Sequence, residues 1–453
     1  MATTYLESDF TGTGASGPAI ATYSFWVKLE LSDDRATLVS GKDNGDYLKV
    51  RFADDGSGHY LGLYGTSMDM KSTRVFRDPG AWYHVVMAFD TGQAAASDRI
   101  KVWINNEQIT DWASDTRFGQ NSDLYLTKAD NVQIGAYDNT EHFDGVMAHV
   151  HCCDGTAYTP TDFAESDSTS GIWVPKTSPS VTYGSKGYFL KFASGAHGTD
   201  SSGNGNDFTV NGTMTNTKDT PNNNWCTMNP LEKNTNNTQT FSNGNTTAVI
   251  TAGYGPVGST MSVSKGKWYA ECHIDSTASS GDLNIMLGIN GSYNMPNNNT
   301  LGYSASAYGF YLYNGYMLNN NTSNSNTGGT QYWTSPGGGI VDDNKYWALA
   351  LDCDNNKLYV RLDGTWLESA DPSAGTGGYS ITAPASTDWG YYRFANGIYF
   401  GNTNTFKWNF GNGFFGTTSA GATNADSDGY GVFKYSVPTG FKALCTAQLA
   451  TYG

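Results

Sequence analysis

Residues 218–231 read Lys-Asp-Thr-Pro-Asn-Asn-Asn-Trp-Cys-Thr-Met-Asn-Pro-Leu, and this stretch divides the chain. It holds two prolines and four asparagines, and its apolar residues follow neither a strand period nor a helical period. Proline and asparagine favour turns. We therefore expect an ordered crossing between two modules, residues 1–217 and 218–453, each long enough to bury its own core.

The composition favours short strands joined by turns. The chain has 54 Gly, 29 Tyr, 21 Phe and 12 Trp, and only 15% of its residues are charged. Aromatic residues are common in strands, and glycine and asparagine are common in turns. The chain is predicted to be all-β, with two tandem antiparallel β-sandwiches.

The net charge and the N-terminal sequence indicate which binding partners and which location to expect. A formal net charge of −16 repels phosphate backbones and anionic bilayers, so we expect no nucleic-acid binding and no docking to a membrane surface. No apolar run is long enough to span a membrane, and the N-terminus lacks the features of a signal peptide. The protein is expected to be made in the cytoplasm of its host cell. Its six cysteines are expected to be small buried hydrophobes rather than a disulfide framework.

Alternating apolar residues mark the strands of the first module. In the run 22–30, Tyr23, Phe25 and Val27 share one face. Residues 36–40 and 47–52 are predicted to form a hairpin around a turn at 41–46 with an Asn-Gly corner. Further strands are predicted within 82–90, 98–105, 132–136 and 146–153, and at 208–210, where the chain returns to the first sandwich.

Several of these motifs, in this order, resemble the laminin-G/pentraxin type of concanavalin-like jelly roll. They are Trp82-Tyr-His-Val85, Lys101-Val-Trp-Ile-Asn-Asn106, and Ile134-Gly135 followed by Phe143-Asp-Gly145. The resemblance covers roughly residues 23–162 and implies a calcium ion at a sandwich edge. The matching oxygen ligands would be Asp43, Asn44, Asp138, Asn139 and Glu141. The alternative is that these polar turns carry Asp and Asn only for their turn geometry.

The second module repeats the strand pattern. Residues 265–274 alternate, and residues 345–354 and 357–362 flank an Asn-Asn turn. Together with Asp363-Gly-Thr-Trp366, this order resembles a SPRY domain over nearly the whole second half. The resemblance implies a second antiparallel sandwich of related, concanavalin-like architecture.

The flanks of this module resemble those of fibre and structural proteins of tailed phages, especially marine ones. The residues that carry this resemblance are 220–231, Trp408-Asn-Phe-Gly411 and 438–446. It implies a virion protein whose partners are other virion proteins and a host-surface glycan or receptor. A homo-trimer is expected by analogy with fibres, although no heptad repeat is present to enforce it.

We find no catalytic residues in the sequence. The glycosidase pattern Glu-x-Asp-x-x-Glu begins at Glu7 and at Glu165, but Gly12 and Ser170 stand in the last position. The chain also lacks a Gly-x-Ser-x-Gly elbow and a zinc-protease spacing. His149, His151 and Cys153 alternate and could hold zinc, but the sequence shows no fourth ligand.

Aromatic residues beside asparagines in the second module suggest a lectin-like surface, because sugar rings stack on tyrosine and tryptophan and amides bind hydroxyls. We expect roughly a third of these aromatic residues to be exposed, since alternate strand residues face a core. The candidates are Tyr303, Tyr308, Tyr311, Tyr313, Tyr316, Trp333, Trp389, Tyr391 and Tyr392.

The sequence therefore favours a non-enzymatic virion surface protein, such as a tail or head fibre, that adheres to a host glycan or receptor. One alternative is a polysaccharide depolymerase or lyase whose site is assembled across loops. Another is a purely structural capsid decoration protein that contacts only neighbouring virion subunits. Location on the head or on the tail stays open.

Overall fold

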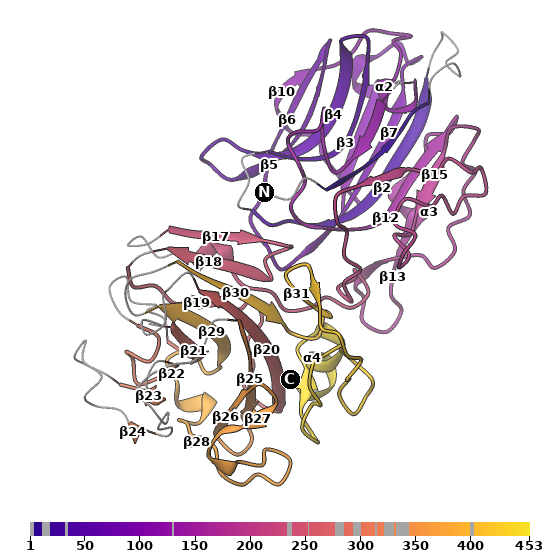
Figure 1. Ribbon diagram of the computed structural model, residues 1–453. Helices are drawn as coiled ribbons and strands as arrows, with labels where there is room; N and C mark the ends of the chain where they lie inside the picture. Colours follow the sequence, from indigo (N-terminus) through magenta and orange to yellow (C-terminus); the bar gives the residue numbers. More distant parts are fainter. Residues whose placement is uncertain are drawn as a thin grey trace. The chain divides into compact units, whose positions relative to one another are not determined.

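The computed structural model describes residues 4–10, 19–31, 35–128, 131–232, 238–251, 253–276, 285–292, 300–312, 315–320, 330–331, 344–398 and 403–453. The chain divides into two compact units, Met1–Asn216 and Thr217–Gly453. Both units consist mainly of antiparallel strands (Figure 1), so the all-β prediction is confirmed. No helix among the described residues is long and apolar enough to cross a membrane.

The first unit contains an eight-stranded sheet. Its strand order is β10 (Trp112–Thr116), β6 (Met68–Phe76), β5 (His59–Gly65), β4 (Asp46–Asp54), β3 (Arg35–Asp43), β11 (Asn131–Ile134), β1 (Tyr5–Ser8) and β16 (Thr209–Asn211). Strand β16 pairs with β1 and places Thr209 beside Glu7, which confirms the predicted return of the chain to this sandwich.

A six-stranded sheet packs against the first sheet. Its order is β15 (Tyr188–Leu190), β12 (Val146–Asp154), β2 (Ile20–Lys28), β7 (Trp82–Asp90), β8 (Ile100–Ile104) and β9 (Glu107–Gln108). A hairpin of β13 (Ala164–Ser166) and β14 (Trp173–Pro175) and the short helices α1 (Ala96–Arg99), α2 (Tyr125–Lys128) and α3 (Pro160–Phe163) complete the unit.

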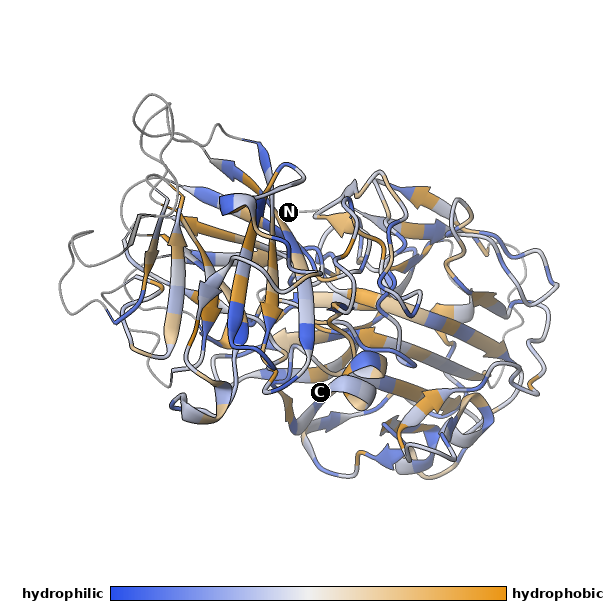
Figure 2. Ribbon diagram, turned by 90° about the horizontal axis from the view of Figure 1, so that it is seen from below, coloured by the Kyte–Doolittle hydropathy of each residue, from blue (hydrophilic) through white to orange (hydrophobic). Residues whose placement is uncertain are grey.

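The core of the first unit lies between the two sheets. Tyr23, Phe25 and Val27 of β2 face it, as their alternation predicts, and meet Val50 and Phe52 of β4 in one buried cluster. The same alternation appears in Figure 2, where apolar and polar residues follow one another along the strands. Each sheet therefore directs every second residue of its strands away from the core.

The β3–β4 hairpin is tighter than the sequence predicts. Strand pairing continues to Asp43 and Asp46, so the turn contains only Asn44 and Gly45 rather than residues 41–46. Both turn residues have positive φ, 46° and 95°, the conformation that an Asn-Gly hairpin turn requires. Gly41 belongs to β3, where a Cβ atom would lie 2.1 Å from the carbonyl oxygen of Tyr125.

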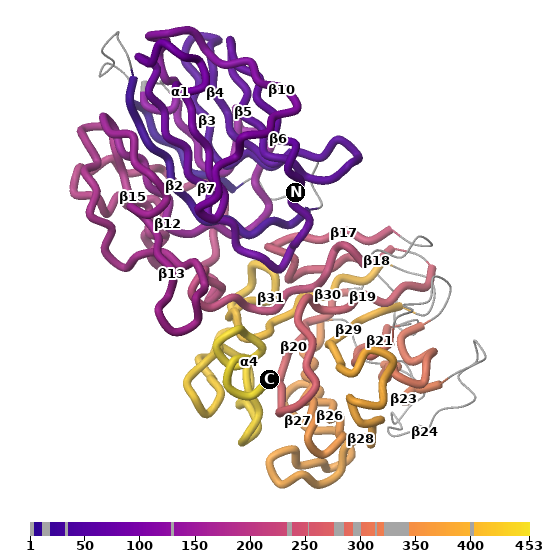
Figure 3. The backbone as a smooth tube through the Cα atoms, turned by 180° about the vertical axis from the view of Figure 1, so that it is seen from behind, coloured from indigo at the N-terminus to yellow at the C-terminus, as the bar shows by residue number. Residues whose placement is uncertain are grey.

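The second unit contains a nine-stranded sheet and a six-stranded sheet, and Figure 3 shows the course of its backbone. The nine-stranded sheet runs β17 (Thr238–Ser242), β18 (Thr247–Thr251), β30 (Asn404–Asn409), β20 (Lys267–Ser276), β25 (Lys345–Asp352), β26 (Lys357–Leu362) and β27 (Thr365–Trp366), with β28 (Tyr379–Ser380) on β26 and β33 (Lys442–Ala443) on β20. The six-stranded sheet runs β19 (Val257–Gly258), β29 (Arg393–Ile398), β21 (Ile285–Asn290), β22 (Ala307–Tyr311), β23 (Tyr316–Leu318) and β24 (Thr330–Gln331).

Short elements surround these sheets. They are the β31 (Phe414–Phe415) and β32 (Thr418–Ser419) hairpin, the 3-10 helices η1 (Pro230–Glu232), η3 (Leu367–Ser369) and η4 (Pro384–Ser386), and the helix α4 (Thr446–Tyr452). Trp268, Leu287, Phe394 and Trp408 meet in the core between the two sheets.

Residues 218–231, predicted as an ordered crossing, fall within the second unit. They pack inside the second unit, where Trp225 forms a β-bridge with Cys445 and Asn223 Oδ1 accepts a hydrogen bond from the Ala447 amide at 3.0 Å. Trp225 is buried because it joins a second apolar cluster on the outer face of the nine-stranded sheet. The two ends of the unit thus form a clasp, which we define as residues 223–226 with 444–447.

Candidate functional site

The candidate site lies on the face of the eight-stranded sheet that points away from the core of the first unit. Val50 of β4 is in the core, so the residues on either side of it, Lys49 and Arg51, lie on this outer face. The strand register sets Lys49 beside Tyr64 of β5 and beside Ser40 of β3. A row of polar and aromatic side chains therefore crosses neighbouring strands.

Tyrosine rings cover the cations of this row. The Lys49 ammonium lies 4.1 Å from the ring centre of Tyr137 and 5.8 Å from that of Tyr47. The Arg51 guanidinium lies 4.6 Å from the ring centre of Tyr64. The contacts are within the range of cation–π attraction. The three tyrosines are only partly buried, so part of each side chain is exposed to solvent.

Gly62 makes room for Tyr64. Arg51 pairs across the strands with Gly62, and a Cβ atom at Gly62 would lie 2.3 Å from the Tyr64 ring. The ring therefore lies flat over the glycine and against Arg51. The Tyr64 hydroxyl donates a hydrogen bond to the Tyr60 hydroxyl at 3.2 Å, which fixes the orientation of the ring.

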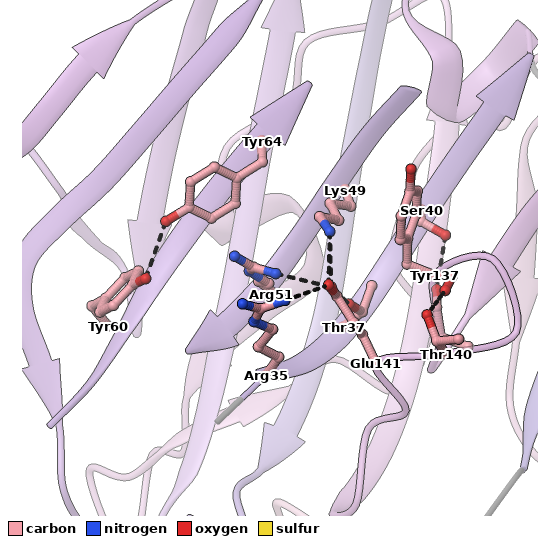
Figure 4. A network of polar contacts seen from close by, with 11 residues as sticks. Arg35, Thr37, Ser40, Lys49, Arg51, Tyr60, Tyr64, Tyr137, Thr140 and Glu141 are labelled. Carbon is pink, nitrogen blue, oxygen red and sulfur yellow. Dashed lines mark hydrogen bonds and ion pairs between the residues drawn. The ribbon is translucent and has the colours of Figure 1, made fainter. Parts of the chain in front are cut away.

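Glu141 binds the cations from above the sheet (Figure 4). The Lys49 ammonium lies 3.0 and 2.9 Å from its two carboxylate oxygens, and an Arg51 guanidinium nitrogen lies 2.9 Å from one of them. Arg35 pairs with the other oxygen at 3.4 Å. We refer to Arg35, Lys49 and Arg51 as the cation cluster. Three positive charges meet one carboxylate in this cluster.

Burial and the neighbouring charges shift the pKa values of Glu141 and Lys49 in opposite directions. Burial alone would raise the pKa of Glu141, but its hydrogen bonds and ion pairs with Lys49 and Arg51 lower the pKa below the ordinary value. Burial lowers the pKa of Lys49, and Glu141 opposes this shift. Glu141 is therefore ionised at neutral pH.

Glu141 reaches the cluster from a tight loop that follows β11. Tyr137 and Thr140 exchange backbone hydrogen bonds of 2.9 Å, and the Phe143 amide donates to the Gly135 carbonyl at 2.9 Å. The Thr37 amide of β3 donates to the Glu141 carbonyl at 3.1 Å. The loop is thus fastened to the sheet on both sides of Glu141.

The structure does not bring the predicted calcium ligands together as a site. Glu141 is bound by cations, Asp138 pairs with Lys42 at 2.6 Å, and Asn139 accepts a hydrogen bond from Gln133 at 2.7 Å. Asp43 is the last residue of β3, and Asn44 lies in the β3–β4 turn. Within the described ranges, no three His, Cys, Asp or Glu side chains are grouped to hold a metal ion, including the zinc alternative in β12. The turn-geometry alternative accounts better for these residues.

The predicted aromatic candidates of the second unit fall into three groups. Tyr308, Tyr311 and Tyr392 are buried in apolar clusters, so their rings cannot stack on a ligand, and their assignment to a glycan surface is wrong. Tyr313 and Trp333 lie outside the described residues. Half-buried positions are occupied by Tyr303, Tyr316, Trp389 and Tyr391.

Trp389 and Tyr391 are neighbours in the structure. Their ring centres are 5.4 Å apart, and the Arg393 guanidinium lies 4.1 Å from the Trp389 ring centre. Arg393 is buried and forms an ion pair with Glu232. The pair remains a glycan-binding prediction, and Arg393 acts as a support beneath Trp389.

Lys49, Arg51 and Tyr64 are not among the site residues predicted from the sequence. A signal was present, because residues 47–52 alternate strictly and the positions opposite the core carry Tyr, Lys and Arg. Large cationic and aromatic residues on the solvent side of one strand indicate a functional face. Their joint contact with Glu141 is invisible in the sequence, since 92 residues separate it from Lys49.

A comparison with protein-family models matches residues 4–164 to the Concanavalin A-like lectin/glucanases superfamily. The matched segment contains most strands of both sheets of the first unit and the whole cation cluster. The first unit therefore has a concanavalin-like fold, as its motifs predict. A comparison with curated proteins gave no match.

Solved structures show weaker similarity. The SPRY domain of human HERC1 is 12% identical, with 38% of this chain and 95% of that domain covered and a TM-score of 0.27. The carbohydrate-binding module CBM66 from Bacillus subtilis is 12% identical. The match covers 40% of this chain and 91% of the module, with a TM-score of 0.25. A third match is domain 4 of the arabinanase AbnA from Geobacillus stearothermophilus, solved in complex with arabinotriose. It is 20% identical, and the match covers 32% of this chain and 64% of that domain, with a TM-score of 0.24. At these values none of the three assigns a function to the chain.

Proposed function

We propose that the protein is a non-enzymatic glycan-binding protein of a phage virion surface, and that the first unit binds host-surface glycan through the outer face of its eight-stranded sheet. The observation that carries this proposal is the row of partly exposed Tyr47, Tyr64 and Tyr137 beside Lys49 and Arg51. Tyrosine rings stack on the apolar faces of sugars, and cations donate hydrogen bonds to their hydroxyls.

Two further observations support the proposal. The family match of residues 4–164 is to a superfamily described by lectins and glucanases. The virion location rests on the resemblance of residues 220–231, 408–411 and 438–446 to the flanks of phage fibre proteins.

Glycan binding is tested with the full chain on an array of bacterial surface polysaccharides. The wild type should bind, and the double variant Tyr64→Ala/Tyr137→Ala should lose at least tenfold in affinity. Tyr430→Ala, at an exposed tyrosine of the second unit, serves as the matched control and should bind as the wild type does. Equal binding by all three proteins would disprove the assigned face.

The same samples separate the alternative functions. Release of reducing ends from a bound polysaccharide would favour a depolymerase, and the absence of any glycan binding would favour a structural decoration protein. Gold-labelled antibodies on intact phage particles test the virion location and distinguish head from tail. Sedimentation of the purified chain tests the proposed homo-trimer.

A further inference from the structure

We infer that the site takes an acidic saccharide, and that Glu141 occupies the subsite of the ligand's carboxylate until the ligand displaces it. This inference rests on the proposed glycan binding and names the substrate class. The first observation is the charge of the cation cluster. Three cations meet one carboxylate there, in a chain whose formal net charge is −16.

Two cations of the cluster, Lys49 and Arg51, are largely buried. The side chains of Lys49 and Arg51 are 10% and 13% exposed, so they are largely desolvated and their attraction to an anion is stronger than in water. Arg51 Nε is buried and has no hydrogen-bond partner. The cluster therefore carries more positive charge than a single glutamate neutralises.

The loop that carries Glu141 is strained. Asp138, Asn139 and Glu141 have φ values of 50°, 58° and 47°, in the left-handed region. Asparagine and aspartate adopt this region readily, but glutamate does so rarely, at a cost on the order of 1 kcal/mol. The contacts of Glu141 with the cation cluster and Thr37 hold the loop in this conformation. Release of the Glu141 side chain would remove these side-chain contacts and leave the backbone hydrogen bonds of the loop in place.

A sugar carboxylate can replace the glutamate carboxylate group for group. Both are planar anions with two acceptor oxygens, so Lys49 and Arg51 can bind either with the same geometry. The exchange leaves the cluster's charge balance unchanged, since one carboxylate leaves as another enters. Tyr64 and Tyr137 flank the position and would contact the sugar rings. A uronic-acid polysaccharide combines these two features.

Calorimetric titration of the full chain tests the inference. The probes are an α-1,4-linked galacturonate hexamer and its fully methyl-esterified form, in which a methyl group removes the charge of each carboxylate. The acid should bind and the ester should bind at least tenfold more weakly. Glu141→Gln should bind the acid about tenfold more tightly than the wild type, because the internal competitor loses its charge. Arg51→Gln should lose binding of the acid.

The matched control is Glu107→Gln, which removes an exposed carboxylate that pairs with Arg74 in the same unit. It should leave the affinity for the hexamer unchanged. Glu141→Asp provides a second variant should Glu141→Gln fold poorly. Its shorter side chain reaches the cluster less well, so it should also bind the acid more tightly than the wild type.

Four results would overturn the inference. Equal binding of acid and ester would show a site for neutral glycans, and the proposed function would stand without it. Weaker binding by Glu141→Gln would show that Glu141 positions the cations instead of competing for them. Equal affinity for monomeric galacturonate and the hexamer would show a site for a lone carboxylate. Binding of neither probe, with glycans bound on the array, would exclude uronates while preserving the proposed function.

Discussion

The protonation state of the buried histidine His84 is set by the residues that pack around it. His84 of β7 is fully buried and stacks on Trp26 with 4.6 Å between ring centres. Trp173 Nε1, which can only donate, lies 3.0 Å from His84 Nδ1. His84 Nδ1 is therefore the acceptor, and Nε2–H donates to the Ser24 hydroxyl at 2.8 Å. This network requires a neutral imidazole.

The buried histidine predicts a loss of stability in acid. Burial lowers the pKa of His84 from 6.5 to about 3. Between these values the unfolded chain binds a proton that the folded chain does not, so the free energy of unfolding falls as pH decreases from 6.5 towards 3. We expect a contribution on the order of a few kcal/mol. The measurement is denaturant unfolding of the full chain across this range.

The variant His84→Gln should flatten this dependence, because an amide does not titrate. Ser24→Ala is the control, since it removes a partner of His84 and keeps the titrating group. Its stability should fall at every pH with the slope preserved. Parallel slopes for the wild type and His84→Gln would show that His84 is not responsible.

Gly62 provides a test that separates folding from binding. In Gly62→Ala the new Cβ would displace the end of the Tyr64 side chain, which can move at a cost of about 1 kcal/mol or less. The ring would leave Arg51, so glycan binding should fall several-fold. Gly119→Ala, where the nearest atom is 3.5 Å from the added Cβ, should affect neither property. Affinity and thermal unfolding of the three proteins check this expectation.

At the scale of elements, the C-terminal segment of the second unit is fastened to β20 by a buried carboxylate. Glu271 accepts hydrogen bonds from the backbone amides of Lys434 and Tyr435, both at 2.9 Å. It also accepts bonds from the Tyr269 hydroxyl at 3.0 Å and the Asn409 amide at 3.2 Å. All four partners donate, so the site requires acceptor oxygens.

Glu271→Gln should therefore destabilise the second unit by about 2–4 kcal/mol, because its amide group would face donors. The measurement belongs at pH 8, above the value of about 7 to which burial raises the pKa of this carboxyl. Glu368→Gln, at an exposed position of the same unit, should change stability little. If Glu271→Gln and the wild type have the same free energy of unfolding, the four hydrogen bonds do not hold the segment.

Strands were the most predictable elements, and their outer faces were the least. The alternation in residues 22–30 and 265–274 correctly assigns Phe25 and Trp268 to cores. It gives no indication that Trp173 covers Trp26, or that Phe433 covers Tyr269. These covering segments are distant in sequence, so a local pattern cannot reveal them.

The same limit applies to the candidate site. Lys49 and Arg51 can be placed on an outer face from the strand period alone, whereas Glu141 arrives on a loop whose path depends on the finished sheet. The resemblance to calcium-binding jelly rolls predicts Glu141 as a metal ligand, whereas the structure places it among side-chain cations. Its carboxylate binds side-chain cations.

At the scale of the whole molecule, each unit has its own core, with Phe52 in one and Phe394 in the other. We expect two calorimetric unfolding transitions for the full chain. Phe52→Ala should lower one midpoint and Phe394→Ala the other, each through a loss of about 3–5 kcal/mol. A single transition that both substitutions shift together would show that the units unfold cooperatively.

The clasp of the second unit has a mechanical consequence. Residues 223–226 and 444–447 lie against each other through the Trp225–Cys445 bridge and the bonds of Asn223. Tension applied across these two segments would act on the clasp, and the strands of the second unit would carry almost no force. A force that pulls these two segments apart would therefore strain the clasp first, and the two sheets of the second unit would keep their shape.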